Sequence, residues 1–403
     1  MPSTIYDVTT WTIPGSPATT AYTDIGAIVN SIIADVKINQ PSQASKPGAV
    51  IYIPPGDYSL KTRIVIDISY LQIKGSGHGF TSSSIRYNSG DTSSWSEIWP
   101  GGSRVRVENT DGHSEAILIN RGGLPRLSSI ELMDFCLDGV SFTPNQNSYT
   151  NGKTGIHSTA PTDSLRIVGM GLVYLEHGIV LTDVDALHIT NNFICECGNC
   201  IELPSSGQAS MVNDNLLGAG PYGFTLFVEN HFGLIVSGNN IFPRGKSSVH
   251  LKNATNNTIT ANRLHAFYSG MITTEGACHN NLIASNHFLR NNESFGAFLS
   301  VPHPQDDLFG LVQLNGSGNT VVSNHFSFDV PSGNILPSGA TPTLVLVKSG
   351  DNNYVATNHH AANVSVHSVV LDGSTTNTKV LDCGSAAEFQ ALTGATYGFR
   401  ATP

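Results

Sequence analysis

Hydrophobic and polar positions recur along the chain with a nearly fixed period. A β-branched residue, two mostly small or polar residues and an Asn appear as ITNN, VNDN, VSGN, ITAN, IASN, VVSN and VATN. The first four intervals are 23, 24, 23 and 24 residues, and the last two are 38 and 34 residues. Short β-rich segments at this period are typical of a solenoid, with about three strands of roughly 4–6 residues in each coil. The repeated residues are Asn192, Asn215, Asn239, Asn262, Asn286, Asn324 and Asn358.

The repeated Asn distinguishes between folds that share this period. Leucine-rich repeats need a ladder of Leu, which is missing here, and a β-sandwich of regular hairpins would not place Asn at one fixed position. Asn tolerates the left-handed backbone of a bend, and its amide can bond to the Asn one coil away. One coil upstream, Met170 takes the Asn position. The pattern therefore predicts an all-β fold, a right-handed parallel β-helix.

The N-terminal segment predicts a cap for the open end of this solenoid. In TDIGAIVNSIIADVK the apolar side chains share one helical face, and Thr23 is the expected N-cap. Such a helix would cover strand edges that are otherwise exposed. We expect one β-helix domain over 1–403, with an arm and capping helix at about 1–48, coils at about 49–380 and a tail at about 381–403. The apolar face consists of Ile25, Ile28, Val29, Ile32, Ile33 and Val36.

Composition and charge narrow the class of partner. Only 12% of residues are charged and the formal net charge is −10, which argues against nucleic acid or another polyanion and favours a neutral substrate. No apolar run of about 18 residues is present, so no membrane-spanning segment is expected. The start MPSTIYDVTTW lacks the basic and apolar stretches of a signal peptide. We expect either a cytoplasmic protein or the mature form of a secreted one.

The cysteines favour packing over metal binding. Cys195, Cys197 and Cys200 have a C-x-C-x-x-C spacing, but structural zinc usually takes four ligands in two separated pairs, and no second cluster exists. On a strand, Cys195 and Cys197 share one face, as stacked small core residues do. We therefore assign no metal and no cofactor.

Two motifs resemble other β-helix enzymes without matching them. GSGHG at residues 75–79 and the pair Asp306–Asp307 resemble polygalacturonase elements, but their order is reversed and they lie far apart. A calcium-dependent pectate lyase would need clustered acidic ligands and a basic groove, which the net charge opposes. GSGHG most simply predicts tight turns with one His on a ladder.

Two carboxylates stand out when five coils are aligned on their Asn. Glu196 lies four residues after Asn192, where the next coils hold Ala, Pro, Ala and Arg. Asp185 lies seven residues before it, where they hold Gln, Phe, Thr and His. A solvated surface acid would explain either one alone. A pair that flanks one bend is a candidate acid/base site.

Long strings of the chain closely resemble the inulin fructotransferases that form difructose dianhydrides. Among them are GMGLVYLEHGIVL, DALHITNNFICECGNCIEL, ENHFGLIVSGNNIFPRG and DFCLDGVSFTPNQNSYTNGKTGI, and the likeness extends over nearly the whole chain. The resemblance implies a β-helix, a homotrimer, no metal and a catalytic pair. That pair, an Asp in DAL and a Glu in ECGNC, falls on Asp185 and Glu196. Further members of family-like strings are candidates for binding substrate hydroxyls: Lys153, Glu202, Arg244 and Tyr268.

The resemblance implies fructosyl transfer, with Glu196 favoured as the acid and Asp185 as base or charge stabiliser. Trp95, in a Gly/Ser-rich loop, is a candidate sugar-stacking residue, and a packing role explains it equally well. If the chain ran straight on both sides of the Asn192 bend, the two acids would lie more than about 10 Å apart. Glycosidic chemistry needs about 5–9.5 Å between the two carboxyl groups. Either a loop folds back, or each site takes one acid from each of two subunits of the trimer.

Three functions stay open at this point. The first is an inulin fructotransferase that releases difructose dianhydride, with dianhydride III favoured over I. The second is a difructose dianhydride III hydrolase that produces inulobiose, because the same fold and acid pair could serve the reaction with water. A non-enzymatic β-helix, such as a fibre or adhesin, would not explain the family-like strings.

Overall fold

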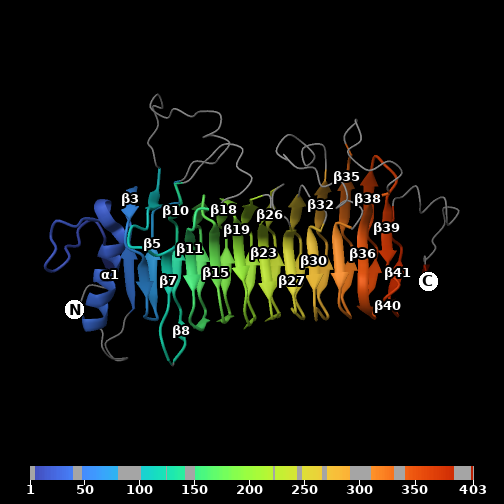
Figure 1. The fold of residues 1–403 in the computed structure, drawn as a ribbon, viewed down its shortest axis with the longest axis horizontal. Helices are drawn as coiled ribbons and strands as arrows, with labels where there is room; N and C mark the ends of the chain where they lie inside the picture. Colours follow the sequence, from blue (N-terminus) through green and yellow to red (C-terminus); the bar gives the residue numbers. More distant parts are fainter. Residues whose placement is uncertain are drawn as a thin grey trace. The chain divides into compact units, whose positions relative to one another are not determined.

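The computed structural model describes residues 5–39, 48–79, 101–123, 125–140, 150–220, 223–242, 247–265, 270–290, 310–330, 341–384 and 401–402. The protein is a right-handed parallel β-helix, as predicted (Figure 1). It divides into two compact units, Met1–Ile201 and Glu202–Pro403. No helix among the described ranges is long and apolar enough to cross a membrane.

In the first unit, successive turns of the chain stack as parallel strands in four sheets. Sheet A contains β1 (Ile5–Asp7), β2 (Ala49–Tyr52), β5 (Leu71–Lys74), β9 (Glu131–Met133), β13 (Arg166–Val168) and β17 (His188–Thr190). Sheet B contains β3 (Gly56–Leu60), β6 (Ser103–Val107), β10 (Cys136–Asp138), β14 (Gly171–Val173) and β18 (Phe193–Cys197). Sheet C contains β4 (Ile64–Ile66), β7 (Glu115–Ile119), β11 (Thr154–Ser158), β15 (His177–Leu181) and β19 (Asn199–Leu203). The short sheet D contains β8 (Leu127–Ser128), β12 (Thr162–Asp163) and β16 (Val184–Asp185).

The second unit repeats the same order of sheets. Its sheet A strands are β21 (Met211–Asn213), β25 (Ile235–Ser237), β28 (Thr258–Thr260), β31 (Leu282–Ala284), β34 (Thr320–Val322), β37 (Tyr354–Ala356), β41 (Lys379–Leu381) and the antiparallel β42 (Ala401–Thr402). Sheet B has β22 (Leu216–Ala219), β26 (Asn240–Ile241), β29 (Arg263–His265), β32 (His287–Arg290), β35 (His325–Phe328) and β38 (His359–Ala362). Sheet C has β23 (Phe224–Glu229), β27 (Ser247–Lys252), β30 (Ile272–Glu275), β33 (Val312–Asn315), β36 (Thr343–Asp351) and β39 (His367–Leu371), with β40 (Thr375–Thr376) paired to the end of β36. Sheet D has β20 (Gly207–Gln208) and β24 (His231–Phe232).

The predicted capping helix is α1 (Ala21–Asn39), which packs against β2, β3 and β4 at the start of the first unit (Figure 1). All six residues of the predicted apolar face are buried. The predicted N-cap was wrong by one residue, because Asp24 leaves the helical backbone and its Oδ1 accepts the Ala27 N–H at 3.4 Å. Asp24 also accepts hydrogen bonds from the backbone of Lys61 and Thr62, so the cap ties α1 to the first coil. The sequence did not predict β1, which extends sheet A from the N-terminal arm.

The repeated Asn residues form the predicted ladder in the interior of the second unit. Asn239 Nδ2 donates to Asn262 Oδ1 at 2.9 Å, and Asn262 Nδ2 donates to Asn286 Oδ1 at 3.0 Å. The expected left-handed bend was misplaced, since the positive φ belongs to the residue before each Asn. A small or polar side chain there leaves the Asn amide free to reach the next coil. The left-handed residues are Asn191, Asp214, Gly238, Ala261, Ser285, Ser323 and Thr357.

The structure contains a second Asn ladder that the sequence analysis missed. Asn257 Nδ2 donates to Asn281 Oδ1 at 2.9 Å, and Asn281 Nδ2 donates to Asn319 Oδ1 at 3.0 Å. Asn319 Nδ2 in turn donates to Asn353 Oδ1 at 3.3 Å. Each of these residues lies five positions before a residue of the first ladder, so the same alignment of coils contained the signal. Both corners beside sheet A are therefore fixed by buried amides.

Three histidines form a column on the outer face of sheet B in the second unit. The His287 and His325 ring centroids are 5.2 Å apart, and those of His325 and His359 are 5.1 Å apart. The Nδ1 atoms of His325 and His359 are 3.1 Å apart, so one proton lies between them. Burial, then neighbouring His325 and Arg263, lower the pKa of His287, and burial, then His359, lower the pKa of His325.

This column predicts a loss of stability in acid. Because the pKa of His325 is lower in the folded than in the unfolded chain, the unfolded chain binds more protons as pH falls below about 6.5. Stability should therefore be highest above that pH and should decrease as the pH falls further. We expect the thermal midpoint to drop more between pH 8 and pH 5.5 for the wild type than for His325→Gln. His113→Gln, at an exposed His of the first unit, is the control, and equal drops in all three proteins would contradict the prediction.

Candidate active site

Asp185 lies at the end of the two-residue strand β16. Val184 before it points into the core, so the Asp185 side chain points outward and is 21% exposed. The residues on either side of this strand, Asp183 and Ala186, have φ of 49° and 50°. Two left-handed bends thus fix the backbone that carries the carboxylate.

Arg126, which the sequence analysis missed, is the partner of Asp185. Arg126 Nη1 donates to Asp185 Oδ2 in a close ion pair. Arg126 Nη2 donates to two backbone carbonyls, Thr162 O at 3.2 Å and Asp183 O at 3.0 Å. Arg126 precedes strand β8, so its side chain crosses β12 to reach β16. No signal in the sequence pairs these residues, because coils of unequal length separate them.

Asp163 is a second acid beside Asp185. The register of β12 and β16 pairs Asp163 with Asp185, and adjacent strands lie about 4.8 Å apart. Asp163 Oδ1 accepts a hydrogen bond from Ser164 Oγ at 2.8 Å. The alignment of five coils started at Asn192 and did not include the coil upstream, whose corresponding position is Asp163. Asp185 is therefore singular among those five coils but not in the whole stack.

Glu196 has a left-handed backbone and is nearly buried. Its φ is 56°, it is 8% exposed, and it is the one Glu with positive φ among the described residues. The left-handed conformation costs about 1–2 kcal/mol for a residue with a Cβ. Its carbonyl accepts the Tyr174 N–H at 3.1 Å, and Tyr174 is left-handed at the corresponding corner of the coil before. The same conformation recurs at bends throughout the described coils, so Glu196 is distinguished by its buried carboxyl group rather than by its backbone.

The two acids occupy opposite corners of one coil. Asp185 is on sheet D and Glu196 is on sheet B, and the whole of β17 separates them along the chain. Both flank sheet C, since β15 ends at Leu181 shortly before Asp185 and β19 begins at Asn199 shortly after Glu196. No loop folds this segment back, because only two residues lie between β16 and β17 and two between β17 and β18.

Lys153 lies at the Glu196 corner. Its Nζ donates to Gly139 O at 2.7 Å, and burial lowers its pKa. Asn151 Nδ2 donates to Tyr174 O at 2.7 Å, which ties this segment to the residue that binds the Glu196 carbonyl. Lys153 therefore lies at the same corner of the stack as Glu196, with its ammonium group at Gly139, two coils before Glu196.

Of the remaining predicted site residues, the structure describes only Glu202. Glu202 is half-buried in the part of β19 that belongs to the second unit. Trp95, Arg244 and Tyr268 lie outside the described residues, and so does the pair Asp306–Asp307.

The cysteines pack in the core, as predicted, and two glycines of the GSGHG segment have a left-handed backbone. Cys197 and Cys200 are fully buried, and their thiols donate to the carbonyls of Leu172 at 3.6 Å and Ile194 at 3.4 Å. Burial raises the pKa of Cys197 to about 12, as for a packed thiol. Gly77 and Gly79 both have positive φ, and the His78 ring lies 6.4 Å from that of Phe193.

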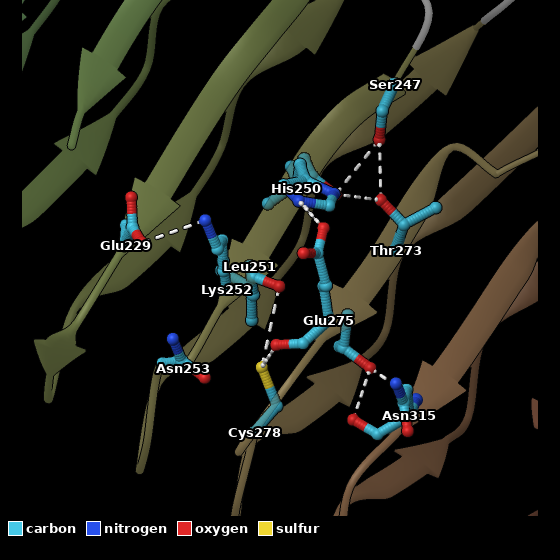
Figure 2. A network of polar contacts seen from close by, with 12 residues as sticks. Glu229, Ser247, His250, Leu251, Lys252, Asn253, Thr273, Glu275, Cys278 and Asn315 are labelled. Carbon is cyan, nitrogen blue, oxygen red and sulfur yellow. Dashed lines mark hydrogen bonds and ion pairs between the residues drawn. The ribbon is translucent and has the colours of Figure 1, made fainter. Parts of the chain in front are cut away.

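Another group of charged side chains lies on sheet C of the second unit (Figure 2). Lys252 Nζ is 3.0 Å from Glu229 Oε1, and His250 Nε2 is 3.4 Å from Glu275 Oε2. His250 Nδ1 is 2.7 Å from Thr273 Oγ1. Both carboxylates have basic partners on the neighbouring strand, so this group is a cross-strand network rather than a second acid pair.

The comparisons with known proteins agree with this architecture. The family profile described as the β-helix repeat of inulin fructotransferase matches residues 285–403, and the profile described as periplasmic copper-binding protein (NosD) matches residues 131–297. An inulin fructotransferase of Arthrobacter globiformis, described as DFA-I-forming, is 49% identical over 398 residues, which is 98% of each chain. The chain belongs to the inulin fructotransferase family.

Solved structures of fructotransferase-family members have the same fold. DFA-IIIase from Arthrobacter chlorophenolicus A6, without its lid and in complex with GF2, is 48% identical over 96% of each chain, with a TM-score of 0.88. The same enzyme in complex with DFA-III is 44% identical over 99% of each chain, also with a TM-score of 0.88. This protein is therefore an enzyme of a fructan-acting family.

Proposed function

We propose that this enzyme depolymerises inulin by intramolecular fructosyl transfer and releases difructose dianhydride. In this reaction the bond between an anomeric carbon and the oxygen of the remaining chain breaks, and an acid gives its proton to that oxygen. A hydroxyl of the neighbouring fructose loses its proton to a base and attacks the anomeric carbon. The product is cyclic because this hydroxyl, rather than water, is the nucleophile, so the site must exclude water.

Two observations support the roles of the acids. Asp185 is held in an ion pair by Arg126, which fits a carboxylate that acts as base or charge stabiliser. Glu196 is nearly buried at its corner, away from bulk water, which fits an acid that must give its proton to the substrate rather than to solvent.

We further propose that each site combines Asp185 of one subunit with Glu196 of another in a homotrimer. Three copies that face a common axis with sheet C would bring the Asp185 corner of each copy to the Glu196 corner of the next. The outward row of sheet C in the first unit supports this arrangement, since it is largely apolar: Val65, Leu118 and Val180, with His157 as its polar member. In the second unit the corresponding row is mixed, with three apolar residues and three polar ones: Phe227, Leu346 and Val370, and His250, Thr273 and Gln313.

Hydrolysis of difructose dianhydride III to inulobiose is the second candidate function. It is favoured by the likeness to the DFA-IIIase structures. The same acid pair would serve with water as the nucleophile. Among the dianhydrides, we keep III as the expected product, although the Arthrobacter globiformis relative is described as DFA-I-forming.

Incubation with inulin, and separately with purified difructose dianhydride III, tests the proposal. We expect a cyclic dimer from inulin, and chromatography against both dianhydride standards identifies it as III or I. Rapid formation of inulobiose from the dianhydride, with little action on inulin, would favour the hydrolase instead. The Asp185→Asn protein is the control for contaminating activity. Absence of both products from the wild type would reject both functions.

A further inference from the structure

We propose that Arg126 is a positioning residue that fixes the carboxylate of Asp185 for the reaction. The inference rests on the proposed function, in which Asp185 acts on the substrate. The Arg126 guanidinium group makes three hydrogen bonds. Two of them go to backbone carbonyls, of Thr162 and Asp183, and the third goes to Asp185 Oδ2.

The backbone contacts make the guanidinium a rigid support. Its planar fork has a fixed geometry, so two carbonyls on neighbouring coils determine where Nη1 points. The chain that carries Arg126 is also held, because Arg121 Nη2 donates to the carbonyls of Pro125 and Arg126. The direction of the Asp185 carboxylate is therefore set by the stacked coils rather than by its own rotamer alone.

Arg126 also counteracts the charge of Asp163, the acid next to Asp185. Asp163 lies beside Asp185 in register, and two carboxylates on adjacent strands repel each other. The Arg126 charge offsets this repulsion and draws Asp185 Oδ2 toward β8. Without Arg126, Asp185 would lose the cation that its Oδ2 contacts, and its carboxylate would be free to turn away from Asp163.

A positioning role differs measurably from a structural or a substrate-binding role. Arg126→Ala is expected to lower kcat by about tenfold to a hundredfold, because small misplacements of a reacting group have effects of this size. The KM should change by less than about threefold, since Arg126 does not hold the substrate. Guanidinium in the assay should restore part of kcat for Arg126→Ala. Arg126→Lys should stay well below the wild type, because it keeps the charge and loses the fork.

The test is a double-mutant cycle with Asp185→Asn, assayed with whichever fructan substrate the wild type turns over. If Arg126 acts through Asp185, Arg126→Ala should change kcat by less than about twofold in the Asp185→Asn background. Arg166→Ala is the matched control, because Arg166 makes an ion pair of 3.6 Å with Glu131 on sheet A of the same unit. It should keep the wild-type kcat and KM.

The outcomes separate this inference from the function on which it rests. Equal losses from Arg126→Ala in both backgrounds would overturn the positioning role while leaving the function intact. An increase in KM alone would also overturn it and would make Arg126 a substrate contact. A wild type that converts neither inulin nor difructose dianhydride III would overturn the proposed function, and with it the role of Arg126.

Discussion

Glu196→Gln is expected to lower kcat on the fructan substrate by about a hundredfold to ten thousandfold, the usual contribution of a general acid. Gln has nearly the same shape but cannot give a proton to the departing oxygen. The left-handed backbone of Glu196 and its carbonyl bond to Tyr174 do not depend on the carboxyl group, so the variant should fold. Initial rates at saturating substrate, with the thermal midpoint measured in parallel, check the prediction.

Asp185→Asn should cause a loss of similar size, because it removes the charge that the Arg126 pair holds at the opposite corner. Glu131→Gln is the matched control, since Glu131 is also an outward, partly buried acid with a basic partner. Its activity should stay within about twofold of the wild type. A rate within tenfold of the wild type for either site variant would remove that acid from the mechanism.

Mixing the two inactive chains tests where the acids of one site come from. If each site takes Asp185 from one subunit and Glu196 from the next, assemblies refolded from both variants contain some sites with two intact acids. Partial activity is then expected from the mixture and none from either variant alone. An inactive mixture whose assemblies contain both chains would show that one chain supplies both acids.

The architecture was predictable because every coil contains the same kind of bend. A bend must turn the chain while its buried polar groups stay bonded, and a stacked amide solves this at Asn239, Asn262 and Asn286 alike. The exact backbone roles were less predictable. Neighbours such as Thr23 and Asp24, or Asn191 and Asn192, have similar preferences for caps and bends, and tertiary contacts choose between them.

The environment of the candidate site was less predictable than the acids themselves. Asp185 and Glu196 came from departures in the repeat and from the family-like strings. Asp163 was accessible to the same alignment, because it lies 22 residues before Asp185, within one coil. Arg126 was not, since 36 residues separate it from Thr162, whose carbonyl it binds. Pairing across coils depends on the lengths of inserted loops, which the repeat does not encode.

The largest expected loss of stability comes from Asn262→Ala. The Asn262 amide is 2% exposed, and its Nδ2 donates to Val236 O and Thr260 O at 3.0 Å. Its Oδ1 accepts from both the backbone N–H and Nδ2 of Asn239. Alanine removes all these bonds and leaves buried groups on two coils without partners. At about 1–3 kcal/mol for each group that stays unsatisfied, the unfolding free energy should fall by about 3–5 kcal/mol.

Asn213→Ala is the matched control for the ladder variant. Asn213 lies on β21 of sheet A, two strands from β28, is only half-buried, and accepts one bond from Ser237 Oγ at 3.1 Å. Its loss should cost less than about 1 kcal/mol, because water can replace that bond. Urea unfolding followed by circular dichroism measures both variants under the same conditions. Equal midpoints for the two would mean that the coils relax to satisfy the orphaned groups, and that strand pairing rather than the amide ladder holds the corner.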